Sequence, residues 1–296
     1  MDKTIALYSK GLTEKTTAGL MRVIDLLYEK GITIYLNIMD PGGHHFDNDH
    51  RIILFSETSD LPADVCMILS VGGDGTFLET AMRVRSTGIP VAGINTGRLG
   101  FLANIPDNDI EKSIDLLCSG QYEPVSRSML EIVSPRGLFG NGSGNGNAMA
   151  LNEITVQKAD QRMITITVKV DGIFLNTYRA DGLIISTATG STAYNLSVGG
   201  PILSPTDDSI IIVPMSPHNL TIRPIIVTGR SVITLEPGGR SSECLVTCDS
   251  KAVRVPAGTL LEVRQAASRL NTVLTAGNDF FSTLRNKLMW GADPRN

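Results

Sequence analysis

The sequence has few cysteines and no long apolar run. Its four cysteines, Cys66, Cys118, Cys244 and Cys248, include no CxxC pair, so neither a disulfide scaffold nor a zinc ribbon is indicated. No stretch approaches the roughly eighteen consecutive apolar residues of a membrane-spanning helix, and the first residues run into a strand-like pattern instead of a signal peptide. We therefore expect a cytoplasmic protein with no membrane partner.

An excess of positive charge is also lacking. Lys and Arg total 26 against 30 Asp and Glu, which gives a formal net charge of -4. Such a balance provides no basic field for a polynucleotide, so no nucleic-acid partner is expected. Apolar residues at 42% and charged residues at 19% are typical of a globular chain with a sizeable core, and a length of 296 residues favours two domains.

Strand and helix patterns alternate in the first part of the chain. Strands are predicted over 4–9, 32–36, 65–71 and 90–95, and helices around 20–27, 77–85 and 107–119. Residues 65–71 are apolar almost throughout, as expected of a strand that is covered on both faces. This βαβ series predicts a Rossmann-like parallel sheet.

Beyond about Val125 the pattern changes to β-branched runs that are separated by turn residues, which predicts a mainly antiparallel β-sandwich. The last segment places Phe280, Phe281, Leu284 and Leu288 at the spacing of a short amphipathic helix, which we expect to pack against the first domain. The predicted organisation is an α/β domain over 1–125 together with about 277–296, and a β-rich domain over 126–276.

Two polar segments each have a functional and a structural interpretation. Five glycines and three asparagines in 137–147 favour a flexible hairpin connection over a nucleotide lid. A second segment holds enough imidazoles and carboxylates for a metal, but no apolar framework flanks it, so a solvated loop is favoured and no metal-ligating residue is predicted. Its members are His44, His45, Asp47, Asp49 and His50.

Glycine is abundant, with 29 residues, and one cluster directly follows the buried strand as Gly72-Gly73-Asp74-Gly75-Thr76. Backbone N–H groups at this edge of a parallel sheet suit a polyphosphate, and Thr76 is predicted to cap the next helix. Asp74 is unfavourable beside an anion unless it holds a divalent cation or accepts a proton from a hydroxyl. A tight turn with a capping acid is the structural alternative, and the five residues alone do not separate the two.

Several familiar motifs are missing. There is no G-x-x-x-x-G-K-[ST], and the nearest approach to G-x-G-x-x-G has Leu78 at its last position. G-x-S-x-G and H-E-x-x-H are also missing, which removes the commonest hydrolase signatures.

The segment 181–201 is a second dense region, in which a strand runs into a loop crowded with hydroxyls and then into Tyr194. Hydroxyls and amides suit a nucleotide, and the tyrosine ring suits stacking on a planar base. A Ser/Thr-rich turn that satisfies its own backbone is the structural alternative.

Two further pieces are less specific. Asn152 and Glu153 are adjacent near a strand, so both reach one ligand only from a bulge or a strand end. Residues 213–224 contain three prolines around His218 and Arg223, which by themselves predict a rigid loop.

Together these pieces resemble the NAD kinase family. The matching motifs are Gly72-Gly73-Asp74-Gly75-Thr76, Asn152-Glu153, 181–201, and Pro217-His218-Asn219-Leu220 with Arg223-Pro224; Gly97-Arg98-Leu99-Gly100-Phe101-Leu102 resembles the family's loop after the next strand. Their order and spacing agree from about Val65 to Trp290. The glycine-acid motif is shared with phosphofructokinases and with diacylglycerol or sphingosine kinases, whereas the hydroxyl-rich motif is highly specific.

Two positions depart from the family pattern. Ala188 stands where the family generally has proline, and Cys248-Asp249-Ser250 stands where Asp-Gly is expected. We expect the first departure to loosen its loop slightly, and we assign no functional role to the second.

The resemblance implies phosphoryl transfer from ATP, or another phosphate donor, to the 2'-hydroxyl of the adenosine ribose of NAD, with a divalent ion, Mg²⁺ or Mn²⁺, in a homodimer or homotetramer. It implies that the active site lies between an α/β and a β domain and that Asp74 orients or deprotonates the hydroxyl. The implied binding residues are Gly72, Gly73, Gly75 and Thr76 for phosphate; Asn152 and Glu153 for the dinucleotide; Asp181, Thr189, Thr192, Ala193, Tyr194 and Ser197 for its pocket, partly across a subunit boundary; and Phe101, Arg179 and His218 as further candidates.

Two other functions are compatible with parts of the sequence. A lipid or sugar kinase would share the glycine-acid loop, but no membrane-facing patch or arginine cluster supports it. A catalytically silent NAD or NADP sensor would lack turnover, which the intact Asp74 argues against. The resemblance leaves open NAD or NADH as the acceptor and ATP or polyphosphate as the donor.

Overall fold

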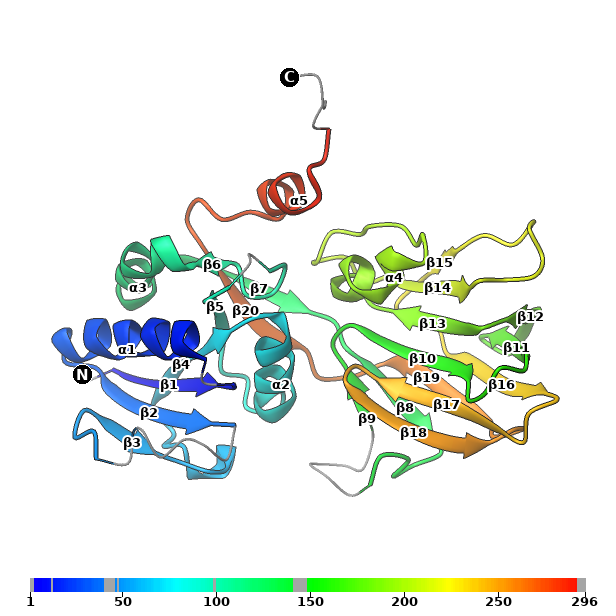
Figure 1. The fold of residues 1–296 in the computed structure, drawn as a ribbon, viewed down its shortest axis with the longest axis horizontal. Helices are drawn as coiled ribbons and strands as arrows, with labels where there is room; N and C mark the ends of the chain where they lie inside the picture. Colours follow the sequence, from blue (N-terminus) through cyan, green and yellow to red (C-terminus); the bar gives the residue numbers. More distant parts are fainter. Residues whose placement is uncertain are drawn as a thin grey trace. The chain divides into compact units, whose positions relative to one another are not determined.

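The computed structural model describes residues 3–11, 13–39, 46, 48–97, 100–140 and 148–291. The chain divides into two compact units (Figure 1). Unit 1 comprises residues 1–126 and 270–296, and unit 2 comprises residues 127–269. In the described part of the chain, every helix falls short of the length and apolarity that a membrane crossing requires.

Unit 1 is built on an eight-stranded sheet with the order β3-β2-β1-β4-β5-β20-β7, and β6 pairs with β5. The pairs from β3 through β5, and those of β5 with β6 and β20, are parallel, which confirms the predicted parallel sheet. The strands are β1 (Thr4–Ser9), β2 (Thr33–Ile38), β3 (Ile52–Leu54), β4 (Val65–Gly72), β5 (Val91–Asn95), β6 (Ile105–Pro106), β7 (Tyr122–Arg127) and β20 (Leu270–Thr275).

The helices of unit 1 bury one apolar face each. In α1 (Glu14–Glu29) the buried face consists of Leu20, Val23, Ile24 and Leu27, at the spacing that the sequence predicts. Thr13 begins this helix by accepting a hydrogen bond from the Thr16 N–H at 3.2 Å. The other helices are α2 (Asp74–Val84), α3 (Ile110–Ser119) and α5 (Phe280–Leu288), with short 3-10 turns η2 (Thr58–Asp60) and η3 (Asp107–Asp109).

Strand β20 corrects the predicted domain boundary. Residues 270–276 are predicted to belong to the second domain, but β20 pairs in parallel with β5 through Thr272 and Val91. Thr272 also donates a hydrogen bond from its hydroxyl to the Val125 carbonyl at 3.1 Å. The chain therefore returns to unit 1 with a strand before it forms α5.

Unit 2 contains two six-stranded antiparallel sheets, which confirms the predicted antiparallel β domain. One has the order β15-β14-β13-β10-β17-β18 and the other β12-β11-β16-β19-β8-β9. The strands are β8 (Leu130–Ser134), β9 (Ala148–Ala150), β10 (Glu153–Lys158), β11 (Ile164–Val170), β12 (Ile173–Ala180), β13 (Gly182–Ser186), β14 (Ile210–Met215), β15 (Ile225–Val227), β16 (Ile233–Gly239), β17 (Glu243–Cys248), β18 (Lys251–Pro256) and β19 (Leu261–Gln265).

The two sheets share one apolar core, because alternate residues of their strands point inward. Ile154 and Leu183 of one sheet and Ile166 and Leu235 of the other belong to the same buried cluster. Adjacent residues of β13 and β14 face the opposite way and form a second cluster that includes Ile184, Ile211 and Val213; Val198 and Leu203 pack against it. The segment after β13 therefore folds back over the outer face of its own sheet.

Candidate active site

The glycine-acid motif joins β4 to α2 at the carboxyl end of a parallel strand. Gly72 has a φ of +155°, and a Cβ there would lie 2.4 Å from the Thr76 hydroxyl oxygen, so glycine is required. Helix α2 begins at Asp74, three residues before the predicted start. The prediction that Thr76 caps this helix is wrong: Gly73 is the N-cap without a side-chain cap, and Thr76 is buried in the first turn.

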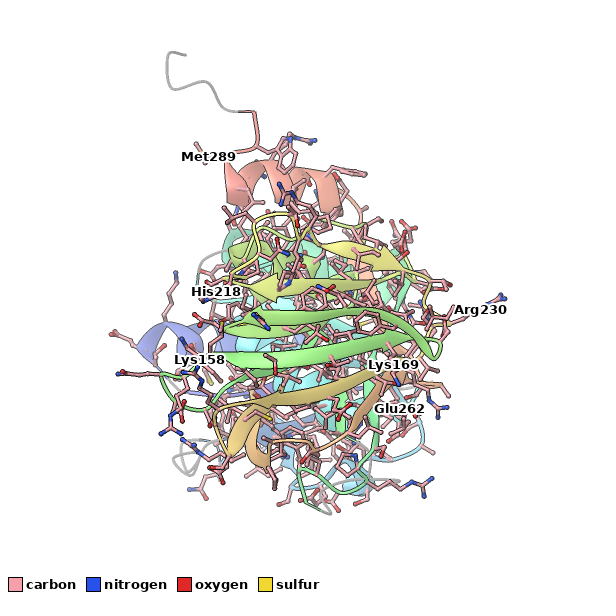
Figure 2. All side chains as sticks on the ribbon, turned by 90° about the vertical axis from the view of Figure 1, so that its right-hand side faces the viewer. Lys158, Lys169, His218, Arg230, Glu262 and Met289 are labelled. Atoms are coloured by element: carbon pink, nitrogen blue, oxygen red, sulfur yellow. The ribbon has the colours of Figure 1, made fainter. Side chains whose placement is uncertain are left out.

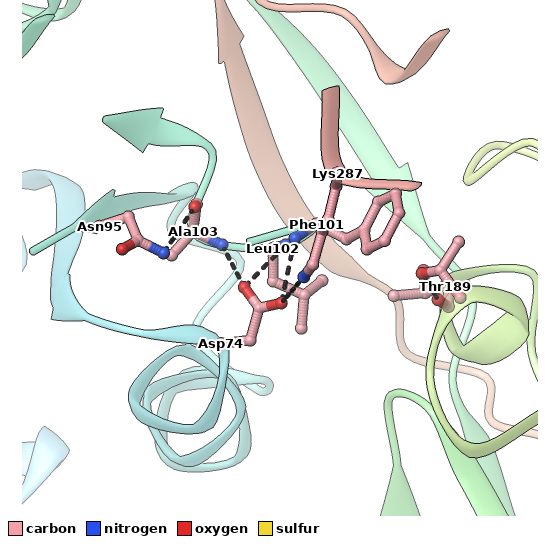
Figure 3. Close-up of polar contacts among 8 residues, drawn as sticks. Asp74, Asn95, Phe101, Leu102, Ala103, Thr189 and Lys287 are labelled. Carbon is pink, nitrogen blue, oxygen red and sulfur yellow. Dashed lines mark hydrogen bonds and ion pairs between the residues drawn. The ribbon is translucent and has the colours of Figure 1, made fainter. Parts of the chain in front are cut away.

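The Asp74 carboxylate is held by the backbone of the loop that follows β5. It accepts hydrogen bonds from the Phe101 N–H at 3.0 Å on Oδ2, and from the Leu102 and Ala103 N–H groups at 3.1 and 2.9 Å on Oδ1 (Figure 3). Three consecutive amides thus converge on one carboxylate, which fixes its orientation at the start of α2.

Gly100 permits this arrangement. A Cβ at Gly100 would lie 1.9 Å from Asp74 Oδ1, which no side chain tolerates. Asn95 holds the loop from the other side: its Oδ1 accepts the Gly97 N–H at 2.7 Å, and its Nδ2 donates to the Ala103 carbonyl at 3.3 Å. The loop is therefore anchored by Asn95, the last residue of β5, and by Asp74, the first residue of α2 after the neighbouring strand β4.

Helix α5 adds a cation and an aromatic ring to this cluster. Lys287 Nζ lies 3.5 Å from Asp74 Oδ2 and 4.6 Å from the centroid of the Phe101 ring (Figure 3). The Phe280 ring lies 6.4 Å from that of Phe101. These contacts confirm that the last helix packs against the first domain, and they place a positive charge beside the candidate catalytic carboxylate.

Asn152 and Glu153 lie at a strand end, as the sequence analysis requires for both to reach one ligand. Glu153 is the first residue of β10, and Asn152 immediately precedes it. The Asn152 carbonyl accepts the Thr187 N–H at 2.9 Å, so this strand end is joined to the start of the hydroxyl-rich segment.

Asp249 fixes the same strand end from the turn between β17 and β18. It has a φ of +49°, and its half-buried carboxylate accepts hydrogen bonds from the N–H groups of Leu151, Asn152 and Glu153 at 2.7, 2.9 and 3.1 Å. No role is predicted for this turn from the sequence, but in the structure it supports the Asn152-Glu153 pair.

Glu153 and Asp249 form a pair of half-buried carboxyl groups. Burial, and secondarily the nearby Asp249, raise the pKa of Glu153 to about 8, while the Tyr194 N–H opposes that shift. Burial also raises the pKa of Asp249, although its three backbone donors favour the charged form. The three backbone donors stabilise the ionised form of Asp249, so protonation at neutral pH is favoured on Glu153, whose buried Oε2 has no hydrogen-bond partner among the described residues.

The hydroxyl-rich segment forms a 3-10 turn, η4 (Thr189–Thr192), and a single helical turn, α4 (Tyr194–Ser197). Many of its polar groups bond to the backbone of the segment itself or of the chain beside it, which agrees in part with the structural alternative. Thr187 donates from its hydroxyl to the Leu151 carbonyl at 2.6 Å, Ser191 accepts the Leu203 N–H at 3.0 Å, and Asn195 donates to the Ser191 and Pro201 carbonyls at 2.9 Å. These hydrogen bonds engage the side chains in shaping the segment.

Other residues of this segment remain candidates for ligand contact. Tyr194 is 38% exposed, and Thr192, Ala193 and Ser197 are partly or fully exposed. The Thr189 hydroxyl is buried and accepts a hydrogen bond from Arg127 at 3.2 Å. A Cβ at Gly190 would lie 2.1 Å from the Asn152 carbonyl oxygen, so this glycine lets the segment approach the start of β10.

Asp181, Arg179 and His218 do not join this cluster within one chain. In the β10–β13 ladder Glu153 is opposite Ser186, whereas Gly182 is opposite Gln157, so Asp181 lies at the other end of the strands, about 16 Å away at ~3.3 Å per residue. Asp181 pairs with Lys158 at 2.6 Å, and the Arg179 carbonyl accepts the His218 N–H at 2.9 Å. Figure 2 shows Lys158 and His218 near the same end of the strands, on the left of the view.

Some predicted positions lie outside the described residues, namely His44, His45, Asp47, Arg98, Leu99 and 141–147. Asp49 bonds to Arg51, which lowers the pKa of Asp49 to about 2, and the His50 ring contacts Tyr28 edge-on. Within the ranges that the structure describes, no three His, Cys, Asp or Glu side chains gather as metal ligands.

Comparison with known proteins assigns both parts of the chain to one family. Residues 38–122 match the model of the ATP-NAD kinase N-terminal domain, and residues 151–275 match that of the ATP-NAD kinase C-terminal domain. The chain belongs to the ATP-NAD kinase family.

Relatives within this family are similar over most of their length. An NAD kinase of Christiangramia forsetii is 40% identical over 302 residues, covering 99% of each chain. An NAD kinase of Cytophaga hutchinsonii is 44% identical over 231 residues, covering 78% of this chain and 77% of that one. These identities extend the family assignment across both units.

Solved structures of the family share the fold. The yeast NADH kinase complexed with NADH has a TM-score of 0.85 at 22% identity and covers 99% of this chain and 89% of its own. An Archaeoglobus fulgidus NAD kinase in complex with ATP has a TM-score of 0.74 at 23% identity, and the match covers 97% of this chain and 98% of that one.

Proposed function

We propose that this protein is an NAD kinase, which transfers the γ-phosphoryl group of ATP to the 2'-hydroxyl of the adenosine ribose of NAD and gives NADP and ADP. Family membership supports the reaction, and one local observation carries the assignment of its catalytic residue. Asp74 stands at the carboxyl end of β4 with its carboxylate fixed by three consecutive amides. A rigidly oriented carboxylate at this sheet edge suits a hydroxyl acceptor.

In this mechanism Asp74 orients the 2'-hydroxyl and accepts its proton as the bond between its oxygen and the γ-phosphorus forms. The bond from the γ-phosphorus to the oxygen bridging the β-phosphate breaks, and ADP leaves with that oxygen. Phosphoryl transfer depends mainly on positioning and charge neutralisation. Mg²⁺ or Mn²⁺ enters with ATP as part of the substrate and neutralises phosphate charge.

The dinucleotide would bind at the start of β10. Glu153, protonated at neutral pH, offers a hydroxyl donor, and Asn152 offers an amide beside it. Thr189, Thr192, Ala193 and Ser197 would line the pocket, and Tyr194 would stack on a planar ring. Glu153 Oε2 is buried and has no hydrogen-bond partner in the part of the chain that the structure describes, which supports a ligand contact here, because such an oxygen is costly to leave unpaired.

We also propose a homodimer or homotetramer, in which Asp181, Arg179 and His218 of one copy complete the pocket of another. Their distance from Glu153 along the strands supports this division. Edge strand β12 exposes Ile173 and Phe174, at 74% and 60%, which suits burial against a second copy. Analytical ultracentrifugation of the full chain tests the assembly: a monomer at assay concentration contradicts it.

Incubation of the full chain with NAD, ATP and magnesium tests the reaction, with NADP read through an NADP-dependent dehydrogenase and with NADH and diacylglycerol as parallel acceptors. Asp74→Asn is expected to abolish most turnover while NAD binding by calorimetry stays largely intact, because the carboxylate acts in the transition state. Tight NAD binding without product in the wild type would indicate a sensor, and unchanged turnover in Asp74→Asn would contradict the catalytic assignment.

A further inference from the structure

All acceptor positions of Asp74 are occupied in the free protein. An ionised carboxylate offers about four lone-pair positions. Oδ1 receives the Leu102 and Ala103 N–H groups, and Oδ2 receives the Phe101 N–H and the Lys287 ammonium. The three amides belong to a loop that Asn95 and Gly100 hold in place, so Lys287 is the partner that exchanges most readily.

Helix α5 presents Lys287 on a defined face. Phe280, Leu284 and Lys287 stand at positions i, i+4 and i+7 and therefore share one stripe of the helix. Asp279 begins the helix with a capping box, in which its carboxylate accepts the Ser282 N–H at 2.9 Å. Because Leu284 is buried and Phe280 meets the Phe101 ring, the docked stripe carries Lys287 to Asp74.

The contacts of Lys287 leave its ammonium group able to bind a further anion. Its side chain is 34% exposed, and one of its three N–H donors is enough for Asp74. Ion pairs that are this exposed contribute little to stability, so the pair with Asp74 is a weak anchor for α5. A weakly held ammonium beside a fixed carboxylate is instead well placed to exchange one anionic partner for another.

We propose that Lys287 is a catalytic residue that moves from Asp74 to the transferred phosphoryl group. The acceptor hydroxyl takes the position of Lys287 on Asp74 Oδ2, and the released ammonium binds an equatorial oxygen of the γ-phosphoryl group. As the new phosphorus–oxygen bond forms and the bond to the bridging oxygen of ADP breaks, the hydroxyl proton passes to Asp74 and Lys287 stays protonated. The negative charge that spreads over the equatorial oxygens is thereby neutralised.

This proposal rests on the proposed kinase activity, and its test separates the two. Lys287→Met removes the charge but keeps an apolar stem over the Phe101 ring, and Lys287→Arg keeps the charge. Arg285→Ala is the matched control, because Arg285 is an exposed cation in the same last turn of α5 and makes no contact with Asp74 among those that the structure describes. Each full-length variant is assayed for kcat, for KM of NAD and for melting temperature.

Lys287→Met is expected to lower kcat about 100-fold, the usual loss when one charge-stabilising donor is removed, with KM of NAD and melting temperature nearly unchanged. Its Kd for the magnesium complex of a non-hydrolysable ATP analogue, measured by calorimetry at saturating NAD, is expected to rise about 10-fold, because the acceptor hydroxyl then releases the ammonium from Asp74. Lys287→Arg should recover most of kcat, and Arg285→Ala should match the wild type.

Wild-type kcat in Lys287→Met overturns the proposal. A loss of kcat in Lys287→Met that disappears when kcat is measured at 15 °C and divided by the concentration of folded protein also overturns the proposal. That result would mean that Lys287 only anchors α5. If the wild type itself makes no NADP, the proposed activity fails, and an affinity for the ATP analogue at saturating NAD that is equal in wild type and Lys287→Met then overturns the phosphate-binding role as well.

Discussion

The Asp249 carboxylate accepts the backbone N–H of Glu153 at 3.1 Å, and the Glu153 carbonyl accepts the backbone N–H of Asp249 at 3.0 Å. This reciprocal pair joins the turn after β17 to the first residue of β10. It also brings a second carboxyl group beside the half-buried Glu153 side chain. One turn therefore sets both the geometry and the protonation of the proposed dinucleotide site.

Asp249→Ala tests the structural part of that relationship. Three backbone donors would lose their acceptor, and a buried unsatisfied donor costs about 1–3 kcal/mol, so we expect the free energy of unfolding to fall by roughly 3 kcal/mol once water satisfies part of the loss. KM of NAD should rise because Asn152 and Glu153 lose their support. Urea denaturation and initial-rate kinetics measure the two effects.

Asp171→Ala is the matched control for this variant. Asp171 also has a positive φ, +53°, and its carboxylate accepts the Val232 N–H at 2.8 Å in a turn of the other sheet. We expect a stability loss without a change in KM of NAD. Equal increases in KM for both variants would show that Asp249 has no specific role in the site.

Glu153→Gln tests whether the Glu153 carboxyl group is protonated in the folded protein. The folded pKa of Glu153 is raised from 4.5 to about 8, so between these values the folded protein holds a proton that the unfolded chain releases. The contribution of this group to the free energy of unfolding is therefore fully present below pH 4.5 and is lost as pH rises through about 8. Between these values the free energy of unfolding falls by about 1.4 kcal/mol per pH unit.

The glutamine variant lacks this titration. We expect its free energy of unfolding to exceed that of the wild type increasingly from pH 5 to pH 8, by about 3 kcal/mol at the upper end if the rest of the site is unchanged. Parallel stability curves for the two proteins over this range would contradict a protonated Glu153. Urea titrations at unit pH steps supply the measurement.

Gly100→Ala tests the close approach of the loop to Asp74. The new Cβ would lie 1.9 Å from Asp74 Oδ1, so the carboxylate or the loop must move. Because displacements of about 1 Å at a reacting group can cost about 100-fold in rate, we expect kcat to fall by that order.

Gly97→Ala provides the comparison in the same loop. Its Cβ would meet the Asn95 Oδ1 at 3.6 Å, an ordinary contact, so kcat should stay within about twofold. Initial-rate kinetics at saturating NAD and ATP compare Gly100→Ala with Gly97→Ala. Equal kcat values for the two variants would contradict the claim that activity needs the close approach at Gly100.

Tyr194→Ala tests the proposed stacking. The ring is 38% exposed, and its truncation removes contact area at the proposed NAD pocket. We expect NAD affinity to fall about 10-fold, in keeping with the 1–1.5 kcal/mol of an aromatic contact, while ATP affinity changes less. Equal losses of affinity for both nucleotides in calorimetry would argue against stacking on NAD.

The start of α2 and the place of β20 show where sequence patterns mislead. Gly73 and Gly75 are poor helix formers, so the sequence places the helix start at residue 77, although α2 begins at Asp74. The strand pattern of 270–275 resembles those that precede it, but β20 pairs with β5, far away in the chain. Local propensity cannot identify the partner of a strand.

The sequence by itself determined the two-part architecture, the buried strand β4 and the motif around Asp74, because apolar periodicity and glycine clusters are local properties. Only the tertiary structure decided the partners of these residues. Lys287 reaches Asp74 across 213 positions, and Asp249 reaches Glu153 across 96. Such contacts depend on helix docking and strand register, which arise from the packing of the whole unit and leave no local pattern in the chain.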